Sequence, residues 1–408
     1  MPTYDFLAEY QWLEQEFAVL ISNFKYSSEI NLRLERMTHL LELLDNPHTR
    51  YHSIHVGGTS GKGSTATMIS AGLTAAGYRT GLHTSPHLQV MNERHQIDGR
   101  YTTTRRLAEL WRKIRPAIAE VTHTSPFGSP SYFEAQVALS FCLFAEEGVD
   151  AAVVEVGVGG SLDATNVLPA TVAVLTNVGL DHTDILGDTV TKIGRDKSGI
   201  IKAGQLAISG CSQPSVKGVI TRRAKQVGAT VWQLGRDFHY DITAEGHGRF
   251  RLPGAFYDEV AVGLPGDFQV QNGAVAAAAL RAFERVTGWP VPEAAVRHGL
   301  TQAHIAGRVE IVQERPLVIL DGAHNADKMR AVTHLMAQTK RPHGRVITVL
   351  GVKAGKATAE MLPMVAEISD EMVVTRFIEK GLWKPIPPCH VGAGAGAVAA
   401  EHAHPCGG

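Results

Sequence analysis

Residues 55–65, with the sequence His-Val-Gly-Gly-Thr-Ser-Gly-Lys-Gly-Ser-Thr, constrain the fold of this chain more than any other segment. An apolar run enters a glycine-rich turn, and a helix-compatible run from Ser64 to Ala76 follows. In such a unit, glycines let backbone N–H groups converge on an anion at a helix N-terminus, and a lysine adds a full positive charge. The segment therefore predicts a strand, a phosphate cradle for a nucleoside triphosphate, and a helix.

The loop departs from the common Gly-x-x-x-x-Gly-Lys-[Ser/Thr] pattern at two positions. Val56 stands where that pattern begins with glycine, and Gly63 stands where it has a hydroxyl directly after the lysine. A glycine- and serine-rich turn between a strand and a helix can also be a plain connector. We favour phosphate binding, because Lys62 lies between two glycines and the next hydroxyl can reach a magnesium ion.

Length, charge and cysteine content bound the class of protein. A chain of 408 residues exceeds the size at which one hydrophobic core keeps growing, so two domains are expected. The 39 Lys and Arg balance 40 Asp and Glu, so no nucleic-acid partner is expected. The sequence has neither an apolar run of membrane-spanning length nor a secretory signal pattern, and no membrane partner is expected. The four scattered cysteines indicate neither a zinc site nor disulfides, which fits a cytoplasmic protein.

Helical and strand patterns alternate along the first part of the chain. The spacing of apolar residues predicts two amphipathic helices before the loop, around residues 7–17 and 34–44. Short apolar runs predict buried strands at 51–56, 78–82, 151–156, 171–176 and 205–209. This alternation is typical of an α/β fold with a P-loop-type, mostly parallel sheet.

A second, smaller α/β pattern follows the Trp-Pro-Val-Pro sequence at 289–292. It predicts a Rossmann-like domain with its own sheet, with strands at 317–320, 345–350 and 371–375 and helices at 327–338 and 358–368. Later residues are rich in Pro, Ala, Gly and His, for which no structure is expected. We therefore expect a first domain over residues 1–298, a second over 299–380, and an atypical low-complexity tail over 381–408.

Three polar clusters fall where strands of the first sheet should end, the edge at which open α/β sheets bind ligands. They occupy residues 84–88 (Thr-Ser-Pro-His-Leu), 153–160 and 176–183. Glu155 lies inside an apolar strand, where a lone carboxylate is costly unless a cation or hydrogen bonds compensate it. A magnesium ion would explain its place, and pairing with an arginine or helix capping is the alternative. His182 taken alone would be a structural histidine, but beside the loop and Glu155 a ligand role is favoured.

Seven motifs in this chain resemble, in their order, those of the folylpolyglutamate and dihydrofolate synthases of the Mur ligase superfamily. The similarity extends from about Tyr26 to about Thr375 and includes Ile-Asn-Leu-Arg-Leu-Glu-Arg at 30–36. Ser60 and Ala306 stand where the family usually has Asn and Pro, and the family's final strand and Gly-Ser signature are missing after Thr375. The motifs are GTSGKGST (58–65), TSPHL (84–88), VEVGVGG (154–160), TNVGLDHT (176–183), IGRDKSGIIK (193–202), AGRVE (306–310) and DGAHN (321–325).

The resemblance implies an ATP-dependent amide ligase that adds L-glutamate to dihydropteroate, to tetrahydrofolate, or to both as a bifunctional enzyme. The acceptor carboxylate would attack the γ-phosphoryl group of ATP, and the glutamate amine would then displace phosphate from the acyl phosphate. Because all three reactants are anionic, positioning and charge neutralisation should dominate catalysis. The implied cofactors are ATP as co-substrate and two Mg²⁺ ions, with K⁺ as a further candidate, and relatives suggest a monomer.

The resemblance also implies residue roles, carried over motif by motif. Lys197 matches a lysine that is carbamylated in the family, whereas an unmodified lysine in a surface or phosphate-facing ion pair is the alternative. Asn272 is expected to open a helix and to meet the adenine side, and Arg308 and Asp321 could instead pair with each other. The implied sets are catalytic Lys62, Lys197 and His182; nucleotide-binding Gly61, Lys62, Gly63, Ser64, Asn272, Arg308, Asp321 and His324; and metal-binding Ser64, Ser85, Glu155 and His182.

The resemblance also implies which residues contact the pterin substrate. Relatives contact the pterin substrate at positions that match Ile30, Asn31, Leu32, Tyr132, Phe133 and Asp163. Aromatic rings can stack on a pterin, but the apolar spacing of Tyr132 and Phe133, at the start of a helix over 133–146, favours the core.

Another Mur-type ligase is the nearest alternative function, against which the segment 30–36 and the 84–88 motif argue. A non-catalytic nucleotide-binding protein would have no need for Glu155, His182 and Lys197.

Overall fold

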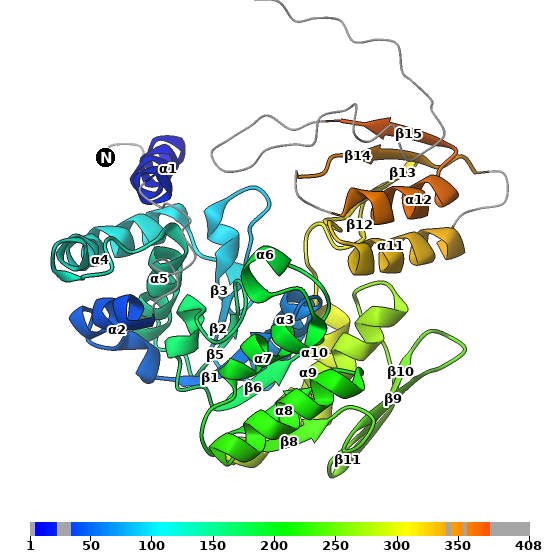
Figure 1. The fold of residues 1–408 in the computed structure, drawn as a ribbon, viewed down its shortest axis with the longest axis horizontal. Coiled ribbons are helices and arrows are strands. Elements are labelled where there is room, and N and C mark those ends of the chain that lie inside the picture. The colour runs from blue at the N-terminus through cyan, green and yellow to red at the C-terminus, as the bar shows by residue number, and fades with distance from the viewer. Residues whose placement is uncertain (1–4, 23–33, 340–343, 354–356, 376–408) are drawn as a thin grey trace, which may run out of the picture. The chain divides into compact units, whose positions relative to one another are not determined.

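The computed structural model describes residues 5–22, 34–339, 344–353 and 357–375. The chain forms two compact units, Met1–Ala306 and Gly307–Gly408, each described by itself below (Figure 1). The predicted pterin-binding segment 30–32 and the predicted tail 381–408 lie outside the described residues. Within the described part of the chain, no helix combines the length and the apolar character needed to cross a bilayer.

Eight strands form the central sheet of the first unit, in the order β4-β3-β2-β5-β1-β6-β7-β8. The six strands from β2 to β8 in that order run parallel, and β3 and β4 add an antiparallel edge. All five strands predicted from apolar runs occur, with ends within two residues of the expected ones, which confirms the mostly parallel α/β fold. The bounds are β1 His52–Gly57, β2 Thr80–His83, β3 His95–Ile97, β4 Arg100–Tyr101, β5 Ala151–Glu155, β6 Val172–Leu175, β7 Leu206–Ser209 and β8 Thr230–Gln233.

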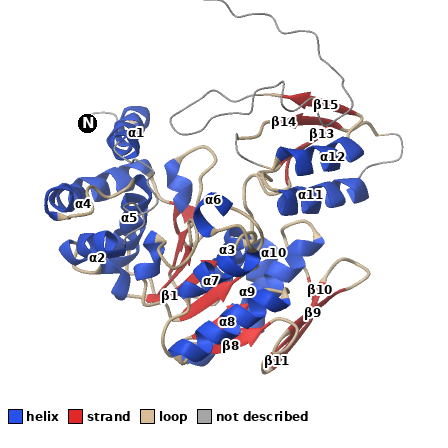
Figure 2. Cartoon of the chain, viewed as in Figure 1, coloured by secondary structure: helices blue, strands red, loops and turns tan. Residues whose placement is uncertain are grey.

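Helices cover both faces of this sheet because its central strands are apolar on both sides (Figure 2). Val153 joins the core that contains the helices α3, α9 and α10, whereas Ala152 and Val154 join the core of α4 and α5. α7 and α8 pack on Ala173 and Ala207. Alternate residues of one strand thus enter different cores, which fixes the register. The helix bounds are α3 Lys62–Ala75, α4 Thr104–Thr124, α5 Tyr132–Glu146, α7 Val190–Lys197, α8 Pro214–Val227, α9 Asp267–Thr287 and α10 Glu293–Gln302.

Two further helices precede the glycine-rich loop, as the apolar spacing predicted. They are α1 (Phe6–Ser22) and α2 (Leu34–Leu43). α1 buries one stripe that includes Leu13 and Phe17, while Leu7 in its first turn is 60% exposed. The remaining short helices are η1 Pro47–Thr49, η2 Met91–Arg94, η3 Ala164–Val167, α6 Thr183–Leu186 and η4 Ser198–Ile200.

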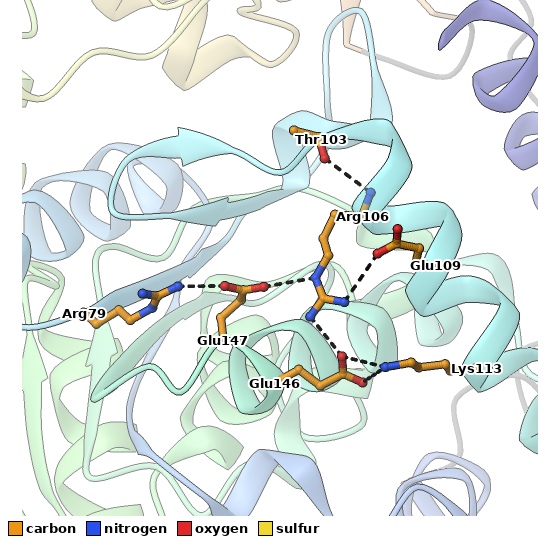
Figure 3. A network of polar contacts seen from close by, with 7 residues as sticks. All are labelled: Arg79, Thr103, Arg106, Glu109, Lys113, Glu146 and Glu147. Carbon is orange, nitrogen blue, oxygen red and sulfur yellow. Dashed lines mark hydrogen bonds and ion pairs between the residues drawn. The ribbon is translucent and has the colours of Figure 1, made fainter. Parts of the chain in front are cut away.

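A partly exposed ion-pair network fastens α4 to the end of α5 (Figure 3). Arg106 donates to Glu146 at 2.9 Å and to Glu147 at 3.0 Å. Glu147 also accepts from Arg79 at 2.7 Å, and Glu146 also accepts from Lys113 at 3.0 Å. Because solvent screens these charges, each pair stabilises the fold by no more than about 1 kcal/mol.

A small antiparallel sheet follows β8, in a region for which the sequence predicted no strands. It consists of β9 (His239–Ile242), β10 (Gly248–Leu252) and β11 (Ala255–Val260), in the order β11-β10-β9. Phe250 and Leu252 of β10 are buried in the core with α9, while Arg251 between them is exposed. The alternation is therefore present, but it is confined to one short strand.

The second unit has the two predicted helices and the three predicted strands in order, preceded by a strand, β12, that was not predicted. Its helices are α11 (Ala326–Thr339) and α12 (Thr358–Ile368), and its small core includes Met329, Met361 and Leu362. Within the described residues its strands form two separate two-stranded sheets rather than one. β12 (Glu310–Glu314) and β13 (Leu317–Leu320) form an antiparallel hairpin because only two residues join them. β14 (Ile347–Leu350) and β15 (Glu371–Val374) pair in parallel, and the chain that connects them contains α12.

Candidate functional site

The glycine-rich loop joins the end of β1, a central strand, to the first residue of α3, which is Lys62. Gly58 and Gly61 have φ angles of 143° and 77°. A β-carbon on Gly58 would lie 2.0 Å from Oγ1 of Thr176, and one on Gly61 would lie 2.4 Å from Oδ1 of Asn272. Both positions therefore need glycine, for their backbone conformation and for the close approach of a neighbour. The loop thus presents a helix N-terminus and a lysine, as an anion site requires.

The segment after β6 holds the loop in this shape. The hydroxyl of Thr176 donates to the carbonyl of Ser60 at 2.7 Å. Asn177 binds the loop twice, because its Oδ1 accepts from the N–H of Ser60 at 2.7 Å and its carbonyl accepts from the N–H of Thr59 at 3.0 Å. The polar cluster at 176–183 therefore builds the loop directly, through the side chain and the main chain of Asn177 and the hydroxyl of Thr176.

Glu155 ends β5, which pairs with β1, and it is 5% exposed. Its Oε2 accepts from the backbone N–H of Ser85 at 2.9 Å. A β-carbon on Gly63 would lie 3.6 Å from the same oxygen, so the carboxylate faces the first turn of α3, where Ser64 follows. The structure thus places Gly63 and Ser85 against Glu155 at the strand-end edge where the polar clusters were expected, with Ser64 next to Gly63 in the first turn of α3.

A buried arginine near Glu155 escaped the sequence analysis. Arg94 is 7% exposed, and its Nε donates to Nδ1 of His87 at 2.7 Å. Burial lowers the pKa of Arg94, and the nearby Tyr132 and Glu155 partly offset this effect. The sequence left pairing with an arginine open as the alternative to a magnesium ion at Glu155. Arg94 supplies part of the positive charge for that alternative. No local pattern could have found it, because charged residues in a short irregular segment are usually exposed.

Lys197, the last residue of α7, is 4% exposed, and its Nζ donates to the carbonyl of Gly159 at 3.5 Å. Burial, reinforced by the charge of Lys62, lowers the pKa of Lys197 from 10.5 to about 7. A surface ion pair for this lysine is therefore wrong, because the side chain is buried. The influence of Lys62 also shows that Lys197 lies close to the glycine-rich loop.

His182 lies at the same edge of the sheet, seven residues after the end of β6. It has a φ of 49°, its side chain is exposed, and it precedes the short helix α6. Among the described residues, no group of three or more His, Cys, Asp or Glu side chains is arranged to hold a metal ion. A metal here would therefore depend on hydroxyl, water or phosphate oxygens as well as on Glu155, and the role of His182 stays a prediction.

Asn272 lies against the loop but does not open its helix, so that expectation is wrong. α9 begins five residues earlier, at Asp267, after Gly266 with a φ of 106°. Gly266 can adopt this conformation at the helix start, so this glycine is the signal in the sequence that marks where α9 begins. The amide of Asn272 donates to Oε1 of Gln269 at 2.9 Å, and its own Oδ1 faces Gly61. This contact with the loop supports a place beside a bound nucleotide.

The two aromatic residues expected near the pterin are half-buried and pack on the core of α4 and α5. The ring of Tyr132 lies 5.6 Å from that of Phe17, and the Arg94 guanidinium lies 5.6 Å from the centre of the Tyr132 ring. Phe133 covers Gly157, where an added β-carbon would lie 2.4 Å from its ring. Both rings thus have a packing role, as the core interpretation expected, and their contact with a substrate stays a prediction.

Asp163 is 4% exposed and shapes the loop after β5. Its carboxylate accepts from the N–H of Val158 at 2.9 Å, from the N–H of Thr165 at 3.0 Å, and from the hydroxyl of Thr165. Burial raises the pKa of this carboxyl group, while those hydrogen bonds lower it. Its oxygens therefore already serve the loop, and a substrate contact stays a prediction.

Arg308, Asp321 and His324 lie in the second unit. Asp321 accepts from the N–H groups of Val309 at 2.9 Å and Ala323 at 2.6 Å. A β-carbon on Gly322 would lie 2.8 Å from Nη1 of Arg308, so the guanidinium lies over this glycine. Nδ1 of His324 hydrogen-bonds the carbonyl of Gly322 at 2.9 Å. Within the described residues of this unit, no ion pair joins Arg308 to Asp321, so the expected alternative pairing does not form.

Comparison with known proteins identifies the family. Residues 56–280 match the Mur ligase middle domain, and residues 307–385 match the Mur ligase glutamate ligase domain. The chain is 35% identical to folylpolyglutamate synthase of Lacticaseibacillus casei, over 80% of this chain and 77% of that protein. It is 32% identical to dihydrofolate synthase/folylpolyglutamate synthase of Bacillus subtilis, over 84% of this chain and 81% of that protein.

Solved structures agree with the sequence comparison. Mycobacterium tuberculosis folylpolyglutamate synthase complexed with ADP has a TM-score of 0.87 and 32% identity, over 96% of this chain and 86% of that one. E. coli FolC in complex with DHPP and ADP has a TM-score of 0.80 and 30% identity, over 90% of this chain and 88% of that one. The resemblance predicted from seven motifs is confirmed: this chain belongs to the folylpolyglutamate synthase and dihydrofolate synthase family of Mur ligases.

Proposed function

We propose that this protein is an ATP-dependent ligase that adds L-glutamate to dihydropteroate, to a reduced folate, or to both. The observation that carries the proposal is the convergence of the glycine-rich loop, the buried carboxylate of Glu155 and the buried amine of Lys197 at one edge of the sheet. The names of the relatives support glutamate and a folate precursor as substrates. The bifunctional activity belongs to this proposal.

The reaction needs neutralisation of charge more than it needs a strong base or nucleophile. The acceptor carboxylate attacks the γ-phosphorus of ATP, ADP leaves, and an acyl phosphate forms. The amine of glutamate then attacks the acyl carbon, phosphate leaves, and a proton is lost from nitrogen. Lys62 and the N–H groups that open α3 hold the phosphates while negative charge moves from the γ-phosphoryl oxygens to ADP.

The residues around Glu155 fit a magnesium ion. Magnesium is usually bound by one or two carboxylates together with waters and substrate phosphates, rather than by a cage of protein ligands. The carboxylate of Glu155 lies against Gly63 and the N–H of Ser85, and the hydroxyls of Ser64 and Ser85 would be further oxygen ligands. Bound there, the ion would neutralise phosphate charge. A second Mg²⁺ near His182, and K⁺, are further parts of the proposal.

Lys197 is proposed to carry a carbamate. Its pKa of about 7 leaves a large share of the amine unprotonated at neutral pH. A neutral amine can attack the carbon of carbon dioxide and lose one proton, which replaces a buried cation with an anion. The unmodified alternative, a lysine that faces the phosphates, has support from its closeness to Lys62.

The second unit is proposed to act on the nucleotide through Arg308, Asp321 and His324. The proposal keeps a first domain over residues 1–298, a second over 299–380 and a tail over 381–408. It also includes a monomeric protein that works in the cytoplasm. A Mur ligase of another specificity and a non-catalytic nucleotide-binding protein are the competing functions. The buried Glu155 and Lys197 favour a ligase, because nucleotide binding alone would not require both.

The deciding experiment is an ADP-release assay with ATP, magnesium and L-glutamate. Dihydropteroate and tetrahydrofolate are supplied separately, and the product is identified by its added mass of one glutamate residue. The proposal expects ADP release that requires both glutamate and a pterin acid. ADP release that is independent of both substrates would refute the ligase. ADP release that requires an amino acid other than glutamate would favour another Mur ligase.

A further inference from the structure

A second cavity on the first unit has a different chemical character from the glycine-rich loop. It has a volume of about 570 Å³ and opens among α7, η4 and α8. Its described lining includes the four cations Arg195, Lys202, Arg222 and Arg223 and no carboxylate. The proposed ligase chemistry uses none of these four side chains.

Two of the cations are fixed by main-chain carbonyl groups. Nζ of Lys202 donates to the carbonyls of Asn166 at 2.5 Å and Leu168 at 2.6 Å. Nε of Arg223 donates to the carbonyl of Ile201 at 3.1 Å. A carbonyl orients a cation without bringing a full negative charge, so both positive charges persist in the cavity. Burial lowers the pKa of Lys202 to about 8, and no carboxylate among its described neighbours offsets this.

The other two cations are exposed and lack an acidic partner. Neither Arg195 nor Arg222 forms an ion pair within 4.0 Å with any described residue. Most other arginines of this unit do, as the network around Arg106 illustrates. The planar guanidinium fork matches carboxylate and phosphate groups, and exposed side chains can close on such a group at small cost. The cavity therefore combines a fixed pair of positive charges with an adjustable pair.

The cavity shares its walls with the proposed active site. Ser198 lines it and directly follows Lys197, and Ser161 lines it two residues before Asp163. The hydroxyl of Ser161 donates to the carbonyl of Asp196 at 2.8 Å, so the two walls are joined. A molecule held in the cavity would therefore contact the segments that carry Lys197 and Asp163.

We propose that this cavity binds a small molecule that carries several closely spaced carboxylates or phosphates. Two sources of this chemistry exist. A γ-linked oligoglutamate chain on a folate gains one α-carboxylate with each added residue, and this source rests on the proposed function. A free polyphosphate has the same charge density and does not depend on that function. Four uncompensated cations match several negative charges better than they match one.

The test measures binding to the full-length protein by calorimetry, with saturating ADP present to fill the glycine-rich loop. The ligands are pteroyl-tetra-γ-glutamate, pteroylmonoglutamate and tripolyphosphate. The double variant Arg195→Gln/Arg222→Gln is compared with Lys225→Gln, which removes an exposed cation that lies on α8, the helix of Arg222, and does not line the cavity. We expect the double variant to bind the multiply charged ligand about 25-fold more weakly, roughly fivefold for each exposed charge contact, and the control to match the wild type.

Each outcome bears on the proposal. Loss of affinity for the tetraglutamate alone identifies the folate chain as the occupant, and loss for tripolyphosphate alone identifies a phosphate compound. Equal binding of both ligands by the wild type and the double variant overturns the site. ADP release from ATP, with L-glutamate and with dihydropteroate or tetrahydrofolate as the pterin acid, is measured in parallel. If that release is absent while the double variant still binds tripolyphosphate more weakly, the proposed function fails and the anion site stands.

Discussion

Three fully buried histidines should make the first unit strongly sensitive to mild acid. Ser140 bridges two of them, because its Oγ lies 2.7 Å from Nδ1 of His83 and 2.7 Å from Nδ1 of His95. On β1, Nε2 of His55 lies 2.8 Å from the hydroxyl of Thr165. Burial lowers the pKa of His55 and His95 to about 3 and that of His83 well below 6.5.

The expected magnitude follows from proton linkage. Each histidine takes up a proton near pH 6.5 in the unfolded chain but stays neutral in the folded unit, so stability is complete above that pH and is lost as the pH falls. Between pH 7 and 5 each histidine lowers the free energy of unfolding by about 2 kcal/mol, and the three together by about 6 kcal/mol. Burial also lowers the pKa of His48 and His87 to about 4, so these two histidines add to the same loss, and Lys197, with a pKa of about 7, titrates at the upper edge of this window.

Equilibrium urea unfolding at pH 7.0, 6.0 and 5.0 provides the measurement. Tryptophan fluorescence follows the first unit, which contains Trp12, Trp111, Trp232 and Trp289. The variant His55→Gln keeps a hydrogen-bond donor for Thr165 and should reduce the loss of stability between pH 7 and 5 by about 2 kcal/mol, the share of one histidine. Free energies of unfolding that agree within about 1 kcal/mol at pH 7.0 and 5.0 would refute the argument from burial.

Three other predictions concern the site and the core. Lys62→Ala should lower ATP turnover roughly 100-fold or more while the circular dichroism spectrum stays unchanged, because the phosphates lose their cation; normal turnover would remove the lysine from the site. Glu155→Gln should raise the magnesium concentration needed for half-maximal activity at least tenfold, and a wild-type titration would count against the metal assignment. Glu134→Gln should lower the free energy of unfolding by about 3–5 kcal/mol, because Arg36, 2% exposed and 2.7 Å from Glu134, would stay buried without the negative charge of that carboxylate. Glu109→Gln in the exposed pair with Arg106 should cost under about 1 kcal/mol, and equal losses in the two variants would contradict this difference (Figure 3).

The proposed carbamate on Lys197 can be tested by intact mass under carbon dioxide and by activity across pH. The buried amine should accept the group most readily above its pKa of about 7. A protein that shows no added mass of carbon dioxide, and whose activity does not respond to bicarbonate, would favour the unmodified lysine.

Local patterns were sufficient for much of the fold. Five strands of the central sheet could be predicted because each is a short apolar run that ends in glycine or polar residues, as at 151–156. The strands β3, β4 and β8 were not predicted, because they are short and mix polar with apolar residues. The loop before α3 could be predicted because its glycines, its lysine and its hydroxyls follow one another directly in the sequence between an apolar run and a helix-compatible run. The three-stranded sheet at 239–260 could not, because its strands mix charged and apolar residues and their burial depends on α9.

The sequence by itself determined the α/β alternation, the phosphate loop and the set of residues that carry the family resemblance, since these depend on neighbours along the chain. Only the tertiary structure decided that Asn272 faces Gly61, that Arg94 lies buried near Glu155, and that Lys197 has a pKa of about 7. The physical reason is that desolvation and close approach depend on segments far apart in the chain. A charged side chain acquires its chemistry from what surrounds it, and the folded packing supplies those surroundings.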